Sequence, residues 1–188
     1  MSAKKSANVS IYQIKITLRD SKPPIWRRIQ VRSDATLGDM HHIIQEVMGW
    51  WDYHLHQFIV GETYYGPLHP GYDDFIDFDE NEVQLSQIVA GEKFSFVYEY
   101  DFGDSWEHIL LVEKVLPVEP DQRYPICLKG KRACPHEDVG GIWGYDTFLE
   151  AIQDPEHPEH EEYLEWAGGE FDPEAFDLDA VNAALLDL

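Results

Sequence analysis

The chain has 188 residues, of which 44% are hydrophobic and 13% aromatic. This composition suffices for one sizeable domain with a buried core, and it excludes wholesale disorder. Asp and Glu number 36 against 14 Lys and Arg, which gives a net charge of −22. Direct nucleic-acid binding requires clustered basic residues, so we expect none. No stretch approaches the roughly 20 apolar residues that span a bilayer, so we expect no membrane segment.

The N-terminal region holds most of the positive charge. Eight of the 14 basic residues lie in residues 1–32, and no Lys or Arg follows Arg132. This region can dock against the acidic remainder or present a small positive patch, and we favour docking. The polar residues 1–9 predict a disordered tail, followed by a single domain over 10–188. The lack of an apolar run after the N-terminal lysines, together with only two cysteines, favours a reducing cytoplasm.

The domain begins with the pattern of a hairpin that leads into a helix. Apolar residues alternate over 11–18 and again over 25–31, as in half-buried strands. Thr36 and Asp39 then form the pattern of a capping box, and Gly49 stands where a left-handed helix cap is expected. The sequence therefore predicts two antiparallel strands followed by one amphipathic helix.

The rest of the chain contains three more strand-like runs and three helical runs. The expected strands cover 54–60, 94–101 and 106–115, and the expected helices cover 145–153, 158–167 and 177–188. Between these elements we expect turns or solvated loops at 61–71 and 71–82, a short apolar piece at 83–90 and an extended proline-rich connection at 117–125.

This order of elements predicts an α+β fold. We expect a mixed or antiparallel sheet with a helix packed on it, in a β-grasp-like order, plus a C-terminal helical layer. The sheet and its helix would occupy residues 10–116. A Cys- and Gly-rich loop and a helical annex would occupy 117–188.

The residue types that carry chemistry are concentrated in residues 99–145. Asp101 and Asp104 flank Gly103 in a predicted tight turn. Two carboxylates placed across a turn can converge on a ligand, or they can simply accept hydrogen bonds from the local backbone. The segment lacks the phosphate-binding loop of a P-loop protein and the catalytic loop of a kinase, so both classes are excluded.

A metal site is the second interpretation of this segment, and zinc is the candidate metal. The spacing of Cys127 and Cys134 is not that of a zinc knuckle, but thiolate, imidazole and carboxylate groups lie close together in the sequence. The candidate ligands are Cys134, His136, His108 and Asp104. In the alternative interpretation both cysteines are small buried residues. Four other histidines follow one another closely, and we interpret them as exposed or rim residues: His41, His42, His54 and His56.

Several motifs resemble the plasmid pRiA4b ORF-3-like family, from about Ile11 to the C-terminus. They are IWRRIQV, HLHQFIV, YEYDFGDSWEH, CLKGKRACPHEDVGG and GEFDPEAFDLDAVN. The chain has His136 where the family often has a second proline, which weakens His136 as a family-wide ligand. The resemblance implies a prokaryotic protein with an α+β fold, from a largely uncharacterised family with some members associated with plasmids and mobile elements.

The resemblance also identifies the positions to test first. The expected ligand cleft contains Tyr100, Asp101, Gly103, Asp104, Trp106, His108, Glu137, Asp138, Gly140 and Gly141, and Cys134 belongs to the same motifs. No catalytic role is available to transfer onto these positions.

Three functions remain open at this point. The favoured one is a non-catalytic binding or interaction domain for a protein partner or small ligand, associated with plasmid or mobile-element biology. The alternative is a metal-dependent hydrolase that uses the Asp, His, Glu and Cys cluster. In the third, the cluster only pins the helical annex to the sheet. Apart from a divalent metal, the sequence points to no cofactor.

Overall fold

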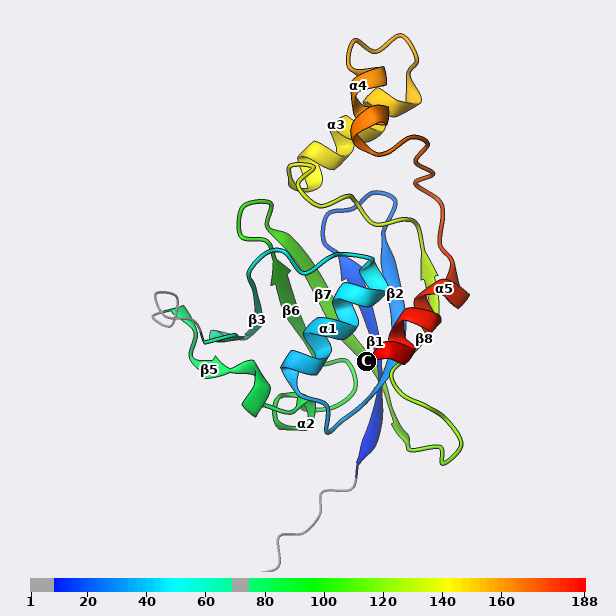
Figure 1. Cartoon of the computed structure of the whole chain (residues 1–188). Coiled ribbons are helices and arrows are strands. Elements are labelled where there is room, and N and C mark those ends of the chain that lie inside the picture. The colour runs from blue at the N-terminus through cyan, green and yellow to red at the C-terminus, as the bar shows by residue number, and fades with distance from the viewer. Residues whose placement is uncertain (1–8, 69–74) are drawn as a thin grey trace, which may run out of the picture.

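The computed structural model describes residues 9–68 and 75–188 (Figure 1). Its elements are β1 (Ser10–Leu18), β2 (Trp26–Arg32), α1 (Leu37–Met48), β3 (His56–Val60), β4 (Thr63–Gly66), β5 (Phe78–Asp79), η2 (Glu80–Glu82), α2 (Leu85–Ile88), β6 (Ser95–Tyr100), β7 (Trp106–Pro117), β8 (Ile126–Lys131), α3 (Gly141–Gln153), α4 (His160–Trp166), α5 (Leu178–Ala184) and η3 (Leu185–Asp187). Among the described helices, none combines the length and hydropathy that crossing a membrane requires.

The described strands form one eight-stranded sheet in the order β5-β4-β3-β6-β7-β1-β2-β8. The central pairs are antiparallel, whereas β4 and β5 run parallel, so the sheet is mixed. The expected α+β class is confirmed, as is the strand-strand-helix order at its start. Alternation in β1 places Ile14, Ile16 and Leu18 in the core beneath α1.

The helix α1 is held at both ends by the residues that predicted it. The Thr36 side chain accepts a hydrogen bond from the Asp39 N–H at 3.0 Å, and the Asp39 carboxylate accepts one from the Thr36 N–H at 2.8 Å. Gly49 ends the helix with φ of +84°, in the left-handed region that glycine adopts without strain. The capping box and the glycine cap are both confirmed.

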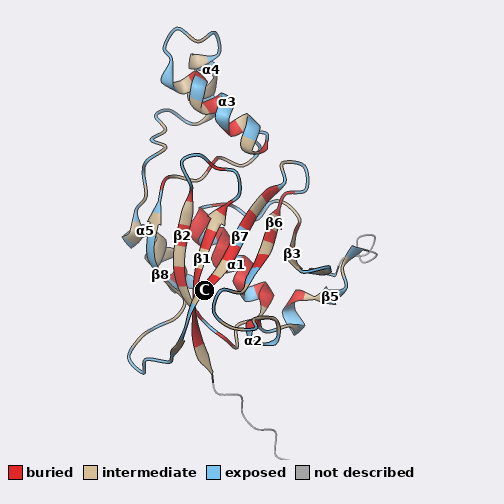
Figure 2. Cartoon of the chain, turned by 180° about the vertical axis from the view of Figure 1, so that it is seen from behind, coloured by how far each residue is buried: buried red, intermediate tan, exposed pale blue. Residues whose placement is uncertain are grey.

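The C-terminal helices divide into two groups. Figures 1 and 2 show α3 and α4 beyond one end of the sheet, whereas α5 lies beside α1 and packs on β8. The expected helices are therefore present, but they cover two separate parts of the sheet.

Three local expectations were wrong. The segment 61–71 contains the strand β4, which forms a hairpin with β3 around Gly61 and Glu62. The expected Cys- and Gly-rich loop contains the edge strand β8, which pairs with β2 through a register shift. Glu80, expected in a solvated loop, is buried and lies 2.8 Å from His56 Nε2. The predicted tail up to residue 8 and residues 69–74 of the predicted turn and loop lie outside the described residues.

The basic residues of the first hairpin dock against acidic partners, as we favoured. Arg19 pairs with Glu107 and Arg28 with Glu113, both of them on β7. Arg27 instead points into the core, where only 3% of its surface is exposed. Its guanidinium donates to Val47 O at 2.8 Å and to Lys131 O at 3.0 Å, so it ties β2 to α1 and β8.

Candidate functional site

Three loops meet at one end of the sheet: the β6–β7 turn (101–105), the α1–β3 loop (49–55) and the Gly-rich loop (133–140) that leads into α3. Figure 1 shows the β6–β7 turn and the start of α3 at this end. Asp104 Oδ2 accepts a hydrogen bond from the Gly140 N–H at 3.1 Å. At Gly141 an added Cβ would lie 2.6 Å from Asp104 O, and φ is +66°. Only glycine fits this close approach of two backbones.

Glu137 makes the second connection between the loops. Its carboxylate accepts hydrogen bonds from the Tyr100 hydroxyl and, at 3.1 Å, from the Trp51 N–H. Beside it, the Trp50 indole donates to Pro135 O at 2.9 Å. Burial, followed by the hydrogen bond with Glu137, raises the pKa of Tyr100 well above its usual value. Both oxygens of Glu137 are thus engaged within the fold.

We call the contacts of Asp104 with Gly140 and Gly141, and those of Glu137 with Tyr100 and Trp51, the clasp. Three other side chains at the junction have polar groups that the clasp does not use. They are His54, Asp101 and Asp138, one from each loop, and their potential ligand atoms lie within 4.8 Å of one another. His54 Nδ1 is 3.6 Å from Asp101 Oδ2, and His54 Nε2 is 3.2 Å from Asp138 Oδ1. We call this set the His-Asp-Asp triad.

The three members differ in how firmly they are held. Asp101 Oδ1 accepts from the Gly103 N–H at 2.9 Å, which leaves Oδ2 turned to His54. The Asp138 side chain is 70% exposed and makes no side-chain hydrogen bond among the described residues. His54 Nε2 is buried, yet it has no hydrogen-bond partner among those residues. The backbone of both Asp101 and Asp138 has a positive φ, at +57° and +63°, which residues other than glycine seldom adopt.

The triad has the donor set of a divalent metal site. One imidazole nitrogen and two carboxylate oxygens suit Zn²⁺, Mn²⁺ and Fe²⁺. Asp101 can act as a direct ligand, or it can orient the His54 ring through Nδ1 while Nε2 and Asp138 hold the ion. No Cys contributes to this set.

An apolar pocket of about 490 Å³ adjoins the triad. Leu55 follows His54, Phe102 follows Asp101, and the Asp101 N–H donates to Leu55 O at 2.8 Å. The pocket is lined by Leu55, His56, Gln57, Tyr64, Pro67, Phe75, Ile76 and Phe102. Its size is within the usual range for small-molecule sites, and none of its lining residues among those that the structure describes is Lys or Arg.

The structure brings together most of the expected cleft residues. The three-loop junction contains Tyr100, Asp101, Gly103, Asp104, Glu137, Asp138, Gly140 and Gly141. Trp106 is buried but lines a cavity beside Asp104 and Gly140.

His108 lies apart from this junction. It is fully buried in the core, packed edge-on to Trp50 with the ring centroids 5.1 Å apart. Burial lowers its pKa to about 4, so the ring is neutral at pH 7. Neither ring nitrogen has a hydrogen-bond partner among the described residues.

The four residues that the sequence suggested as metal ligands do not lie together. Cys134 Sγ lies 3.3 Å from Arg27 Nη2 and 3.6 Å from Met48 Sδ, and burial raises the pKa of its thiol. His136 lies among aromatic rings, including Phe171 at 5.2 Å. With His108 in the core and Asp104 at the clasp, the four candidates face different surroundings. Both cysteines are free thiols.

A closed circuit of four hydrogen bonds holds the α1–β3 loop. The Asp52 N–H donates to Gln45 Oε1 at 3.0 Å, and Gln45 Nε2 donates to the Tyr98 hydroxyl at 3.0 Å. His41 Nδ1 is 2.8 Å from that hydroxyl, and His41 Nε2 is 3.0 Å from Asp52 Oδ1. The His41 ring also stacks on His56, with centroids 3.5 Å apart. His41, His42 and Asp52 form a second metal-capable cluster, but His41 uses both nitrogens in this circuit.

Sequence reasoning missed His54 as a site residue. The signal that identifies it is the register of β3 and β6, in which His56 pairs with Tyr100. This register places the residues just before β3 next to those just after β6, so His54 meets Asp101. His41 and His56 were likewise expected at the rim and are buried.

Comparisons with known proteins agree with the fold and leave the function open. A curated relative, the uncharacterized protein y4hQ of Sinorhizobium fredii, is 37% identical over 182 residues, which is 95% of this chain and 92% of the relative. A solved structure, a protein of unknown function, MM3350 from Methanosarcina mazei Go1, is 39% identical with a TM-score of 0.81, and the match covers 92% of this chain and 98% of that one. The model of the plasmid pRiA4b ORF-3-like proteins matches residues 10–180. The chain belongs to the plasmid pRiA4b ORF-3-like family.

Proposed function

We propose that this protein binds a divalent metal ion with His54, Asp101 and Asp138, and that the site serves hydrolysis of a small substrate. The observation that carries the proposal is the state of His54 Nε2, which is buried without a hydrogen-bond partner among the described residues while it lies 3.2 Å from Asp138 Oδ1. A buried imidazole nitrogen beside a carboxylate is well placed to share a cation.

The clasp supports this proposal because it accounts for the neighbouring acidic groups. Asp104 and Glu137 are engaged with backbone and hydroxyl donors, so the loops stay joined without help from the triad. A bound divalent ion lowers the pKa of a coordinated water and polarises a carbonyl group. Asp101 would fix the ring of His54, and the apolar pocket would hold an apolar part of the substrate. Since the described residues that line that pocket include no Lys or Arg, a substrate without phosphate groups is favoured.

We test the metal site by calorimetric titration of the metal-free protein with Mn²⁺ and Zn²⁺. Wild type should bind one equivalent of metal. Asp138→Asn should weaken binding by about tenfold or more, since even the loss of a group that only supports a ligand typically costs that much. The matched control is Asp121→Asn, an exposed carboxylate in the β7–β8 connection outside both metal-capable clusters. Equal affinity in wild type and Asp138→Asn, with zinc and manganese alike, contradicts the proposal.

A second candidate is a non-catalytic interaction domain for a basic partner. Three aromatic side chains on the loops at the junction and at the start of α3 are strongly exposed: Trp51 at 73%, Tyr53 at 75% and Trp143 at 81%. Exposed aromatic rings in a chain of net charge −22 suit Lys and Arg side chains through cation–π contacts. A role in plasmid or mobile-element biology would then run through that partner. Metal-independent binding of a Lys- and Arg-rich peptide that Trp51→Ala and Trp143→Ala weaken would favour this candidate.

A further inference from the structure

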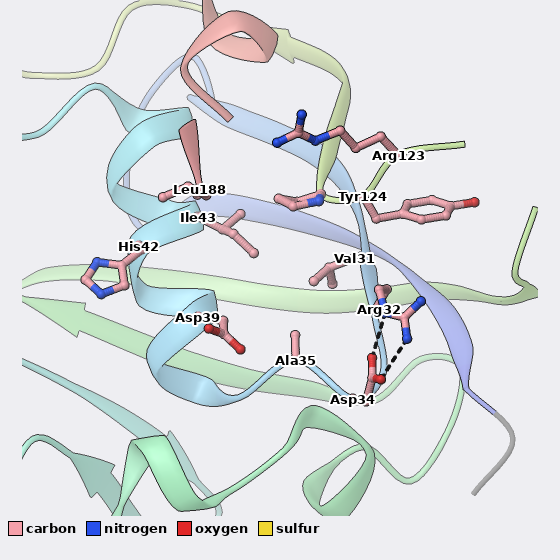
Figure 3. Close-up of a pocket in the computed structure, with 11 residues that line it drawn as sticks. Val31, Arg32, Asp34, Ala35, Asp39, His42, Ile43, Arg123, Tyr124 and Leu188 are labelled. Carbon is pink, nitrogen blue, oxygen red and sulfur yellow. Dashed lines mark hydrogen bonds and ion pairs between the residues drawn. The ribbon is translucent and has the colours of Figure 1, made fainter. Parts of the chain in front are cut away.

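A second pocket lies beside the N-terminal half of α1 (Figure 3). Its volume is about 460 Å³, within the range of small-molecule sites. It is bounded by the end of β2, the N-terminal half of α1 and the β7–β8 connection. The lining residues are Val31, Arg32, Asp34, Ala35, Asp39, His42, Ile43, Arg123, Tyr124, Pro125 and Leu188. None of them belongs to the triad or the clasp.

The floor of this pocket is apolar and firmly held. Val31 and Ile43 are almost completely buried and face each other from β2 and α1, as Figure 3 shows. Val31 is fixed by its pairing with Tyr12 of β1, and α1 is capped at both ends. The pocket is therefore formed before any ligand arrives, so little ordering cost opposes binding.

The two acidic side chains of the pocket, Asp34 and Asp39, accept hydrogen bonds within the fold. Asp34 accepts two hydrogen bonds from Arg32, at 2.9 and 2.8 Å, and the hydrogen bonding with Arg32 lowers the pKa of Asp34. Asp39 accepts the Thr36 N–H of the capping box. Both oxygens of Asp34 are thus used by Arg32, whereas Asp39 uses one oxygen, Oδ2, in the helix cap.

Arg123 is the cation that these pairings leave available. Figure 3 shows it across the apolar floor from the Arg32–Asp34 pair. It donates one hydrogen bond, to Leu186 O, and no carboxylate lies within 4.0 Å of it among residues 9–68 and 75–188. A guanidinium carries five N–H donors in a planar fork, so most of them remain free for an incoming anion.

We propose that this pocket binds a small amphipathic carboxylate, with the apolar body of the ligand on Val31 and Ile43 and its carboxylate on Arg123. A planar carboxylate matches the guanidinium fork through two parallel hydrogen bonds. An uncharged ligand of the same shape lacks this match.

The test compares two probes of nearly equal shape, 2-naphthoate and its neutral analogue 2-naphthamide, by calorimetry on the full chain. Wild type should bind naphthoate about tenfold or more tightly than naphthamide. Arg123→Gln should abolish that preference while the affinity for naphthamide stays the same. Arg19→Gln, which removes an exposed arginine from the β1–β2 turn region, should leave both affinities unchanged.

A second variant tests the apolar part of the proposal. Ala35→Leu adds volume at the lining of the pocket and should weaken both probes, and a circular dichroism spectrum like that of wild type shows that the fold is retained. The proposal is overturned if neither probe binds wild type, if naphthoate binds no better than naphthamide, or if Arg123→Gln keeps the preference. The Asp138→Asn variant should bind naphthoate as wild type does, so this test is independent of the metal site.

Discussion

Asp104 and Gly140, which are 36 positions apart in the sequence, are joined by one hydrogen bond of 3.1 Å between a carboxylate oxygen and a backbone N–H. The next residue, Gly141, passes so close to the Asp104 carbonyl that no side chain fits between them. This contact fixes the start of α3 against the β6–β7 turn. It therefore determines where Asp138, three positions before Gly141, lies relative to Asp101.

Gly141→Ala should destabilise the protein more than an alanine at a comparable open glycine. Gly168 is the matched control, because its φ is +80° and nothing lies within 4 Å of an added Cβ. Gly168→Ala should cost about 1 kcal/mol of unfolding free energy from backbone strain alone. Gly141→Ala adds a collision with backbone at 2.6 Å, so its cost should be roughly 2 kcal/mol larger. Urea unfolding measures both, and equal costs would mean that the close approach does not exist.

Glu137→Gln should lower the pKa of Tyr100 towards its usual value, because the neutral amide no longer opposes ionisation of the hydroxyl that it contacts. Burial remains, so the pKa should still exceed that of a free tyrosine. Absorbance at alkaline pH follows tyrosine ionisation, and Tyr100→Phe identifies the signal. An unchanged titration curve in Glu137→Gln would contradict the hydrogen bond.

The stability of the native state should fall as the pH drops below about 6.5. His108 is buried, and its pKa is lowered to about 4. Between these two values the unfolded chain binds more protons at this position than the native state, so acid favours unfolding. The stabilising contribution is complete above the unfolded pKa and is lost as the pH falls through the folded pKa.

His108→Phe should flatten this part of the pH dependence, because the ring stays apolar and cannot be protonated. The exposed His42 provides the control, and His42→Gln should keep the wild-type slope. Urea unfolding at pH 7.5, 6.0 and 5.0 measures the slopes. A wild-type slope in His108→Phe would show that His108 does not contribute to acid sensitivity.

Arg27→Lys should destabilise the protein although the charge is kept. The lysine cannot donate to Val47 O and Lys131 O together while also covering the Phe176 ring, whose centroid lies 4.5 Å from the guanidinium carbon. Leaving a buried charge with fewer partners should cost about 3 kcal/mol. Arg19→Lys on the surface should cost roughly 0.5 kcal/mol or less by the same urea titration.

Elements with strong local signals in the sequence could be predicted from the sequence alone. The helix α1 followed from Thr36, Asp39 and Gly49, because both ends satisfy backbone groups with neighbouring residues. The strand β8 has no such signal. It is a short edge strand after several prolines, it contains Gly130, and its partner β2 is about a hundred positions away.

The candidate site could be predicted only in part, for two physical reasons. His108 was assigned to the cleft because it is close to Asp104 in the sequence. Side chains two positions apart share one face of a strand, so His108 instead lies with Trp106, Leu110 and Val112 on the buried face of β7. His54 was passed over because its meeting with Asp101 depends on the register of two strands more than 30 positions apart. Register of that kind is set by tertiary packing.

The closed circuit through Asp52 also has a direction. The Asp52 backbone N–H can only donate and its carboxylate can only accept, so the hydrogen bonds run one way around the ring. That sense orients the Gln45 amide, turns the Tyr98 hydroxyl towards His41 and puts the single imidazole proton of His41 on Nε2. The tautomer of a buried histidine is thereby set by one aspartate, two positions before His54.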